Sequence, residues 1–297
     1  MTLPVLVRTR EELAAALAER PVATGAGHGR GVVMTMGALH SGHLSLVTRA
    51  RELADQVLVT IFVNPLQFGA DEDLDTYPRD LERDLALLAG VGADIVFAPT
   101  LDVVFPDGEP VVRVSAGSLG EVLEGVTRPG HLDGALTIVL KLMHLTRPDV
   151  SVFGQKDAQQ VMAVQRMVRD LDVPVSIVAA PTVRDDDGLA LSSRNAYLSP
   201  TERERALVLF RALAAGKRVA LDGEDGDAVR AAARAVLAGV GPDVELDYLA
   251  LIDPRTAVEV PADHHGPVVL AVAARIGATR LIDNVPLRLG ERAGVSA

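Results

Sequence analysis

The stretch GVVMTMGALHSGH, residues 31–43, decides the fold. Its first six residues form a short, mostly apolar run with adjacent valines at Val32 and Val33, which is typical of a buried β-strand. Gly37 ends this run, and the segment that begins at Ser41 has the spacing of a helix. A strand that passes through a glycine turn into a helix begins a βαβ unit, so the sequence predicts an α/β protein.

The same pattern recurs along the first two thirds of the chain. Four further runs are predicted to be buried strands, separated by segments long enough for crossover connections: residues 57–63, 94–98, 150–153 and 175–179. The long apolar segment 132–145, closed by Arg147 and Pro148, is predicted to be a helix packed against the sheet. Strands that alternate with helices predict a Rossmann-like, doubly wound parallel sheet.

The character of the sequence changes after Pro181. A polar stretch at residues 184–188 is followed by helices rich in Ala and Arg, from Pro200 to about Gly239. Three short runs separated by turn residues then predict a small antiparallel sheet: residues 246–252, 268–276 and 280–285. We therefore expect a Rossmann-like domain over residues 1–182 and a smaller α+β domain over residues 183–297.

Composition excludes several classes of protein. The net charge of −11 argues against a general nucleic-acid binder, and the absence of cysteine excludes disulfides, thiolate metal sites and cysteine nucleophiles. No apolar run approaches the roughly 18 residues of a membrane span. Hydrophobic residues make up 48% of the chain but aromatic residues only 3%, which suits a parallel sheet covered by helices. We expect a cytoplasmic protein with no membrane or nucleic-acid partner.

The most informative motif lies where the first parallel strand passes into a helix: Met36, Gly37, Ala38, Leu39, His40, Ser41, Gly42 and His43. Helix N-termini bind phosphates because their amides are unpaired, and glycines let a nucleotide approach the backbone. We expect Ser41 to cap the helix, and His40 and His43 to be neighbours that donate to a polyphosphate. Alternatively, these are two surface histidines on a capped helix, or a zinc pair that lacks a third ligand.

Two further segments carry groups suited to phosphates. Gly154, Gln155, Lys156 and Asp157 follow another predicted strand, where Lys156 supplies a positive charge and Asp157 orients it or accepts from ribose hydroxyls. Leu191, Ser192, Ser193 and Arg194 follow the polar stretch, and such a loop can close over a triphosphate. Taken alone, the lysine segment is more typical of an ordinary helix start, and the Ser-Ser-Arg segment of a solvated loop.

Amide side chains indicate a place for a second substrate. Asn64 and Gln67 follow the second strand, and Gln160 comes one helical turn after Lys156, so these amides can hold a hydroxy acid. Asp84, with Asp80 beside it, is a candidate oxygen ligand for Mg²⁺. Surface glutamines and acidic helix faces are common, which leaves a purely structural role open for each.

In this order, the segments resemble the pantothenate synthetase family of the His-x-Gly-His nucleotidyltransferase superfamily over nearly the whole chain. Residues 36–43 resemble its ATP-binding motif, residues 154–157 its lysine motif and residues 191–194 its mobile phosphate loop. Residues 61–69, 77–79, 128–131, 283 and 284 also resemble family segments. Leu132, Leu191, Asp80 and Gln155 depart from the residues common in the family, but none removes a proposed catalytic group.

The resemblance implies an AMP-forming acid–amino-acid ligase. Pantoate attacks ATP to give pantoyl adenylate and pyrophosphate, and β-alanine then displaces AMP, with Mg²⁺ required. By position, His43 is the proton donor, and five residues stabilise phosphate charge: His40, Lys156, Ser192, Ser193 and Arg194. Gln67 and Gln160 hold pantoate, Gln67 also lies beside β-alanine, Val183 contacts adenine through its backbone, and Asp84 is the magnesium-side carboxylate. The first domain would bind ATP and pantoate, the second would carry the mobile phosphate loop and lid, and the protein would be a homodimer.

Two other classes of protein share part of these features. A nucleotidyltransferase that leaves AMP or CMP on a phosphorylated acceptor has the same His-x-Gly-His turn, but does not account for the paired glutamines. A nucleotide sensor without turnover would tolerate loss of the histidines, Lys156 and Arg194, all of which this chain retains.

Overall fold

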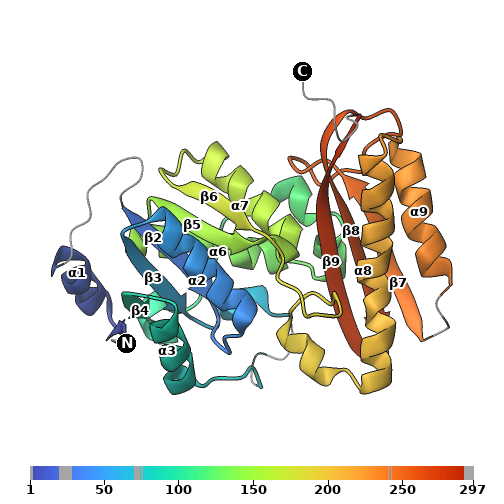
Figure 1. Ribbon diagram of the computed structural model, residues 1–297. Helices are drawn as coiled ribbons and strands as arrows, with labels where there is room; N and C mark the ends of the chain where they lie inside the picture. The colour runs from blue at the N-terminus through green and yellow to red at the C-terminus, as the bar shows by residue number, and fades with distance from the viewer. Residues whose placement is uncertain are drawn as a thin grey trace. The chain divides into compact units, whose positions relative to one another are not determined.

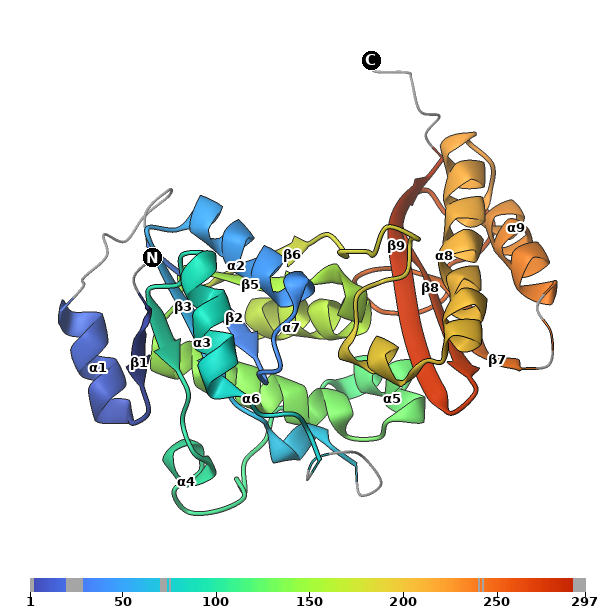
Figure 2. The ribbon, with the colours of Figure 1, turned by 60° about the horizontal axis from the view of Figure 1, so that its bottom comes forward.

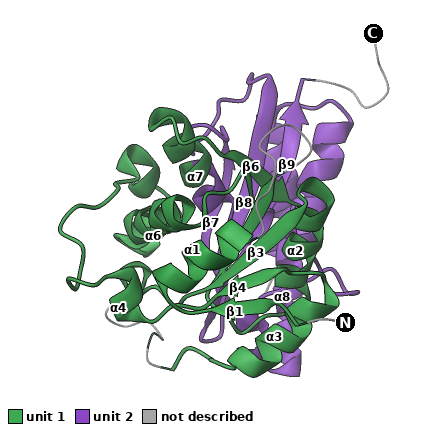
Figure 3. Ribbon diagram, turned by 90° about the vertical axis from the view of Figure 1, so that its left-hand side faces the viewer, with its two compact units in different colours: residues 1–154, 163–181 green, residues 155–162, 182–297 purple. Residues whose placement is uncertain are grey.

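The computed structural model describes residues 3–19, 29–69, 74, 76–239, 241 and 243–290. Contacts divide the chain into two compact units (Figure 3). Unit 1 comprises Met1–Gly154 and Ala163–Pro181, and unit 2 comprises Gln155–Met162 and Thr182–Ala297. The division between Pro181 and Thr182 falls next to the boundary expected from the sequence at residue 182. Residues 155–162, expected in the first domain, group with unit 2 because their contacts lie there.

Unit 1 is built on a six-stranded parallel sheet in the order β1-β4-β3-β2-β5-β6 (β2 to β6 are labelled in Figure 1 and β1 in Figure 2). Its strands are β1 (Val5–Val7), β2 (Arg30–Thr35), β3 (Gln56–Ile61), β4 (Ile95–Phe97), β5 (Val150–Gly154) and β6 (Ser176–Ala180). Five of them coincide with predicted runs to within two residues. The three-residue β1 was not predicted, because it is too short to show a periodicity.

Helices cover both faces of this sheet (Figure 2). One face packs against α1 (Arg10–Glu19) and α6 (His131–Thr146), and the other against α2 (Ser41–Leu53) and α3 (Leu81–Gly90). Side chains alternate along each strand, so Val32 belongs to the first core cluster and Val33 to the second. The doubly wound parallel sheet predicted from the sequence is thereby confirmed. Among the described residues, the other α-helices that lie wholly in unit 1 are the single turns α4 (Leu101–Val104) and α5 (Glu124–Thr127).

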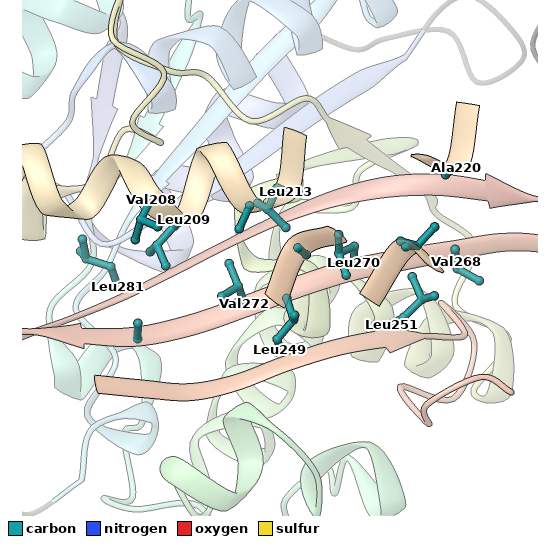
Figure 4. Close-up of a cluster of buried hydrophobic side chains, with 14 of the residues drawn as sticks. Val208, Leu209, Leu213, Ala220, Leu249, Leu251, Val268, Leu270, Val272 and Leu281 are labelled. Atoms are coloured by element: carbon teal, nitrogen blue, oxygen red, sulfur yellow. The ribbon is translucent and has the colours of Figure 1, made fainter. Parts of the chain in front are cut away.

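Unit 2 contains an antiparallel sheet of three strands, β7 (Val244–Ile252), β8 (Gly266–Ile276) and β9 (Thr279–Leu289). Two helices, α8 (Pro200–Leu221) and α9 (Gly226–Ala238), pack on it through the aliphatic cluster drawn in Figure 4. Helix α8 begins with a capping box, in which the side chains of Ser199 and Glu202 each bond the other's backbone N–H. The predicted second sheet and its helices are therefore confirmed.

One helix, α7 (Ala158–Asp170), begins in unit 2 and continues in unit 1. It follows the single turn η3 (Gln155–Asp157), which itself follows β5. Within the described ranges, no helix has both the length and the apolar character needed to cross a membrane.

Candidate functional site

The two predicted phosphate-binding segments of the sheet follow neighbouring strands. β2 ends at Thr35 and leads into the His-x-Gly-His loop, while β5 ends at Gly154 and leads into the lysine segment. β2 and β5 are adjacent in the sheet, and the chain winds outward in opposite directions from them. In doubly wound sheets, ligands bind outside the carboxyl ends of strands at this reversal of strand order. The strand order therefore indicates that the loop after β2 lies at a ligand-binding edge of the sheet.

His40 caps helix α2, and Ser41 does not. The backbone of His40 is extended, with φ −134° and ψ 175°, and its Nδ1 accepts a hydrogen bond of 3.1 Å from the Gly42 N–H. Nδ1 of His43 accepts from the His40 N–H at 3.4 Å, which completes a reciprocal capping box. The expected cap at Ser41 was wrong, because Ser41 already lies in the first turn of the helix. An imidazole nitrogen serves here as the acceptor that Ser or Asp usually supplies.

This capping arrangement fixes the tautomer of both histidines. A neutral imidazole has one N–H donor and one acceptor, so an accepting Nδ1 places the proton on Nε2. The two rings lie 4.1 Å apart, so the side chains are neighbours as the three-residue spacing predicted. The N-terminus of α2 thus presents two imidazole N–H donors beside its backbone amides, which is a combination suited to an anion.

A buried carboxylate holds the backbone of the same loop. Gly37 and Ala38 have φ values of 85° and 51°, in the left-handed region that a side chain disfavours. Asp84, on α3, is only 1% exposed, and its Oδ1 accepts a hydrogen bond of 2.9 Å from the Leu39 N–H. Burial raises the pKa of the Asp84 carboxyl, while the amides of Leu39 and Ala38 act in the opposite direction. A Cβ at position 37 would lie 3.1 Å from Oδ2 of Asp84, so a glycine suits this close approach.

Asp84 was expected to ligate Mg²⁺, but its hydrogen-bond partners are amides of the loop. Mg²⁺ in nucleotide sites takes one or two accessible carboxylate oxygens in addition to phosphate oxygens and water. The Asp84 carboxylate is buried against loop amides, so its surroundings fit an anchor of the loop better than a direct ligand. Asp80 caps α3 by accepting from the Arg83 N–H at 3.1 Å. Among the described residues, no three His, Asp or Glu side chains gather as a protein-held metal would need.

Gln67 is held from several sides in the turn η1 (Pro65–Gln67), which follows β3. Its Oε1 accepts from Nδ2 of Asn64 at 3.1 Å, and its Nε2 lies 3.0 Å from Sδ of Met36. Asn64 is 1% exposed; its Nδ2 also donates to the Gly134 carbonyl at 3.1 Å, and its Oδ1 accepts from the Leu66 N–H. Asn64 was predicted to bind substrate, but its amide is engaged within the protein, which indicates that it supports Gln67.

Helix α6 and Arg128, which precedes it, support the backbone of Gln67, a role not predicted from the sequence. Nδ1 of His131 lies 2.8 Å from the Gln67 carbonyl oxygen, and the Arg128 guanidinium donates to the same oxygen at 3.4 Å. Gly134 brings the helix against this turn, because a Cβ there would lie 2.0 Å from the Leu66 carbonyl oxygen. The sequence signal was the polar run at residues 128–131, which resembles a family segment without revealing its partner.

In unit 2, Lys156 lies in the turn η3. Its side chain is 19% exposed, and its Nζ lies 3.6 Å from Oδ1 of Asp157, so Asp157 can orient the lysine as expected. Gln160 lies half-buried in the first turn of α7. The structure therefore assembles one set of candidate residues in unit 1, around α2 and β3, and a second set in unit 2.

The second set includes the loop at residues 191–194, which emerges from a small hairpin. The Val183 carbonyl accepts from the Leu191 N–H at 2.9 Å, and Arg184 and Ala190 form an antiparallel bridge. Beyond it, Ser192 caps the turn η4 (Ser193–Tyr197), with its Oγ accepting from the Arg194 N–H at 3.3 Å. Ser193 and Arg194 are exposed, so their polar groups can reach a ligand.

Two buried polar residues of β9 belong to this second set, and the sequence analysis assigned them no role. Asp283 pairs with Arg184, at 2.6 and 3.0 Å, and Nδ2 of Asn284 donates to the carbonyls of Gln155 and Lys156, both at 2.9 Å. A signal was available, because two adjacent polar residues interrupt a run otherwise predicted to be a strand. Such residues inside a strand need buried partners.

Comparison with known proteins identifies the family. The family described as Pantoate-beta-alanine ligase matches residues 5–286 of this chain. A pantothenate synthetase of Thermobifida fusca is 57% identical over 295 residues, which cover 96% of each chain. One from Streptomyces avermitilis is 51% identical, over 96% of this chain and 98% of its own length.

Solved structures agree with these relatives. A pantothenate synthetase of Thermus thermophilus has a TM-score of 0.86 and 46% identity, over 95% of this chain and 98% of that one. A pantoate–β-alanine ligase from Francisella tularensis, complexed with an ATP described as beta-gamma and with β-alanine, has a TM-score of 0.73 and 32% identity, over 95% of this chain and 97% of that one. This chain belongs to the pantoate–β-alanine ligase family.

Proposed function

We propose that this enzyme condenses pantoate with β-alanine to pantothenate, using ATP and passing through a pantoyl adenylate. The observation that carries the proposal is the double imidazole cap of α2, where His40 and His43 each turn Nδ1 to the backbone and so carry the proton on Nε2. An N–H pair at a helix N-terminus is suited to the charge that builds up on a leaving pyrophosphate. Membership of the pantoate–β-alanine ligase family identifies the acid and the amine.

In the first step, a carboxylate oxygen of pantoate attacks the α-phosphorus of ATP. The bond from that phosphorus to the bridging oxygen breaks, and pyrophosphate leaves with the electron pair. Both reactants are anions, so fixed donors and cations must offset their repulsion. We assign this role to His40 and His43 in unit 1 and to four residues of unit 2: Lys156, Ser192, Ser193 and Arg194. Because a neutral imidazole donates a hydrogen bond rather than a proton, we assign His43 the role of hydrogen-bond donor to the leaving group through Nε2.

In the second step, the amine of β-alanine attacks the acyl carbon of the adenylate. The bond from that carbon to the AMP oxygen breaks, AMP leaves, and the new amide nitrogen loses a proton. Gln67, held by Asn64 and Met36, is assigned to pantoate and to the neighbourhood of β-alanine. Gln160 is assigned to pantoate and the backbone of Val183 to adenine. No covalent intermediate with the enzyme is required.

Magnesium enters this proposal as part of the MgATP substrate. When bound, the ion would neutralise phosphate charge and polarise the phosphoryl oxygens. Because phosphate oxygens and water supply most ligands of such an ion, the protein needs to contribute few. Asp84 then acts on the nucleotide through the loop that it holds.

We also infer a homodimer formed through unit 1. Val111 and Val112 are both highly exposed on this unit, and Leu101 is half-exposed, so a partner surface would bury apolar area there. Light scattering of the wild type and of Val112→Glu tests the inference. The expected result is a dimer for the wild type and a shift towards monomer for the variant.

The activity is tested by exchange of labelled pyrophosphate into ATP, with enzyme, MgATP and an acid but no β-alanine. We expect exchange that depends on pantoate and is much weaker with other hydroxy acids. Addition of β-alanine should then release AMP in an amount equal to the pantothenate formed. Lack of pantoate-dependent exchange would contradict the proposal and favour a nucleotidyltransferase, whose acceptor keeps the nucleotide.

A further inference from the structure

Adjacent residues on β9 face in opposite directions. Leu281, two residues before Asp283, belongs to the aliphatic cluster under α8 and α9, as Figure 4 shows. Because side chains alternate along a strand, Asp283 lies on the same face as Leu281 and Asn284 on the other. Both are buried at 4% exposure, so each needs polar partners within the protein.

Asn284 holds the turn that carries Lys156. Its Nδ2 donates to the carbonyl oxygens of Gln155 and Lys156, both at 2.9 Å, and its Oδ1 accepts from Nε2 of Gln155 at 3.2 Å. One amide thus forms three hydrogen bonds with residues 128 and 129 positions earlier in the chain. Since two of them go to backbone carbonyls, Asn284 fixes the path of the main chain from which the lysine projects.

Asp283 holds the hairpin that leads to the phosphate loop. Its carboxylate receives two bonds from the Arg184 guanidinium, at 2.6 and 3.0 Å, and the same guanidinium donates to the Gly188 carbonyl at 3.1 Å. Arg184 also lies over the ring of Phe210 on α8, 5.0 Å from its centroid. A bidentate pair of this kind specifies both distance and orientation, and its low exposure strengthens it.

The hairpin that contains Arg184 leads directly into the loop at residues 191–194, so it sets the position of that loop. Its closing bonds join Asp185 to Leu189, at 2.8 Å, and Leu191 to Val183, at 2.9 Å. Asn195 then donates to the Ala190 carbonyl at 3.0 Å, across the loop. The turn η4, which contains Ser193 and Arg194, also contacts β9.

We propose that Asp283 and Asn284 are positioning residues that attach both phosphate-binding segments of unit 2 to a single strand. Asn284 sets the position of Lys156, and Asp283 sets that of the Ser192–Arg194 loop through Arg184. The consequence is that the lysine and the loop keep a constant spacing, because their two anchors are consecutive residues. The catalytic consequence rests on the proposed function, whereas the attachment itself does not.

The attachment is tested by hydrogen exchange of the unliganded full-length protein, followed by mass spectrometry. We expect Asn284→Ala to speed amide exchange in residues 155–158 by roughly tenfold and to leave residues 183–191 nearly unchanged. Asp283→Asn should show the reverse pattern. Leu281→Ala, which removes apolar contacts from the same strand, is the control for general loosening of the sheet and should spare both segments.

The catalytic consequence is tested by kinetics of pyrophosphate exchange. Asn284→Ala should lower kcat about 10- to 100-fold. Leu281→Ala should lower the thermal midpoint of unfolding by a similar amount but leave kcat near that of the wild type. In a Lys156→Arg background, the further loss on adding Asn284→Ala should shrink to less than about threefold, because the two residues act through one group.

Several results would overturn the proposal. It fails if either anchor substitution loosens both segments equally, if neither segment responds, or if Leu281→Ala lowers kcat as far as Asn284→Ala. Asp283→Asn could fail to fold because it leaves Arg184 unpaired. In that case Arg184→Lys tests the same attachment of the hairpin to β9, since lysine keeps the charge but cannot form the bidentate pair. Hydrogen exchange needs no substrate, so failure of the wild type in the exchange assay would reject the proposed function and leave the attachment to be decided separately.

Discussion

The carboxylate of Asp84, on α3, accepts a hydrogen bond of 2.9 Å from the backbone N–H of Leu39, in the loop that precedes α2. The two residues are 45 positions apart in the chain. This bond and the histidine cap of α2 hold the two residues that directly follow the left-handed pair Gly37 and Ala38.

We expect Asp84→Ala to fold but to adenylate slowly. Release of the Leu39 amide lets the loop relax from its strained backbone, and displacement of His40 by about 1 Å should lower kcat/KM for ATP about 100-fold. The measurement is pyrophosphate exchange as a function of ATP concentration. Asp225→Ala is a matched control, because it removes an aspartate that also accepts from a backbone N–H, at the start of α9. It should cost about 1 kcal/mol of stability with activity retained.

Asp84 should also leave a signature in the pH dependence of stability. Burial raises the pKa of its carboxyl, so the folded protein holds this proton more tightly than the unfolded chain does. Its contribution is therefore fully present below about pH 3.9 and is lost as pH rises through the raised value. Denaturant unfolding of wild type and Asp84→Asn across this range should show the variant gaining relative stability as pH increases. A constant difference would contradict the raised pKa.

Replacement of either proposed phosphate ligand should separate folding from catalysis. His43→Ala and Lys156→Ala should keep a wild-type circular dichroism spectrum and lose most of the adenylation rate. We expect a loss of at least roughly 100-fold, because each removes a donor used in the transition state. The controls are His144→Ala and Lys217→Ala, which remove the same types of side chain from exposed positions on α6 and α8. Near-normal exchange in His43→Ala or Lys156→Ala would remove that residue from the mechanism.

Asn64 should act on pantoate through Gln67. Asn64→Ala leaves the Gly134 carbonyl without its side-chain donor and frees the Gln67 amide, so we expect a loss of about 1–3 kcal/mol of stability. The KM for pantoate should rise more than the KM for ATP. Steady-state kinetics of the double variant Asn64→Ala/Gln67→Ala should match those of Gln67→Ala alone. Fully additive losses would show that Asn64 acts independently.

The layers of the fold could be predicted from the sequence because each rests on a local pattern. The continuous apolar character of residues 31–36 and 57–63 indicates buried strands. The capping residues around Pro200 are typical of a helix start. The three-residue β1 lies below the length at which such a pattern is visible. The N-cap propensity of serine favoured Ser41 as the cap of α2, but the imidazole of His40 caps the helix instead.

The supporting residues of the site could not be predicted, because their partners lie far along the chain. Asp84 reaches Leu39 across 45 positions, and Asn284 reaches Lys156 across 128. No local spacing distinguishes such a carboxylate or amide from one in a solvated face. The sequence could therefore indicate which residues have groups suited to phosphates, but not which residues hold them.

The distance between Asn284 and Lys156 in the chain has a consequence for biosynthesis. At roughly 5–20 residues per second, a ribosome adds Asn284 about 6–26 s after it has added Lys156. Throughout that interval the lysine turn lacks the Asn284 amide that holds its carbonyls, although the last strand of the parallel sheet is complete once Ala180 has been added. We therefore expect a nascent chain to form the sheet early and to become competent to consume ATP only after its last strand has been made.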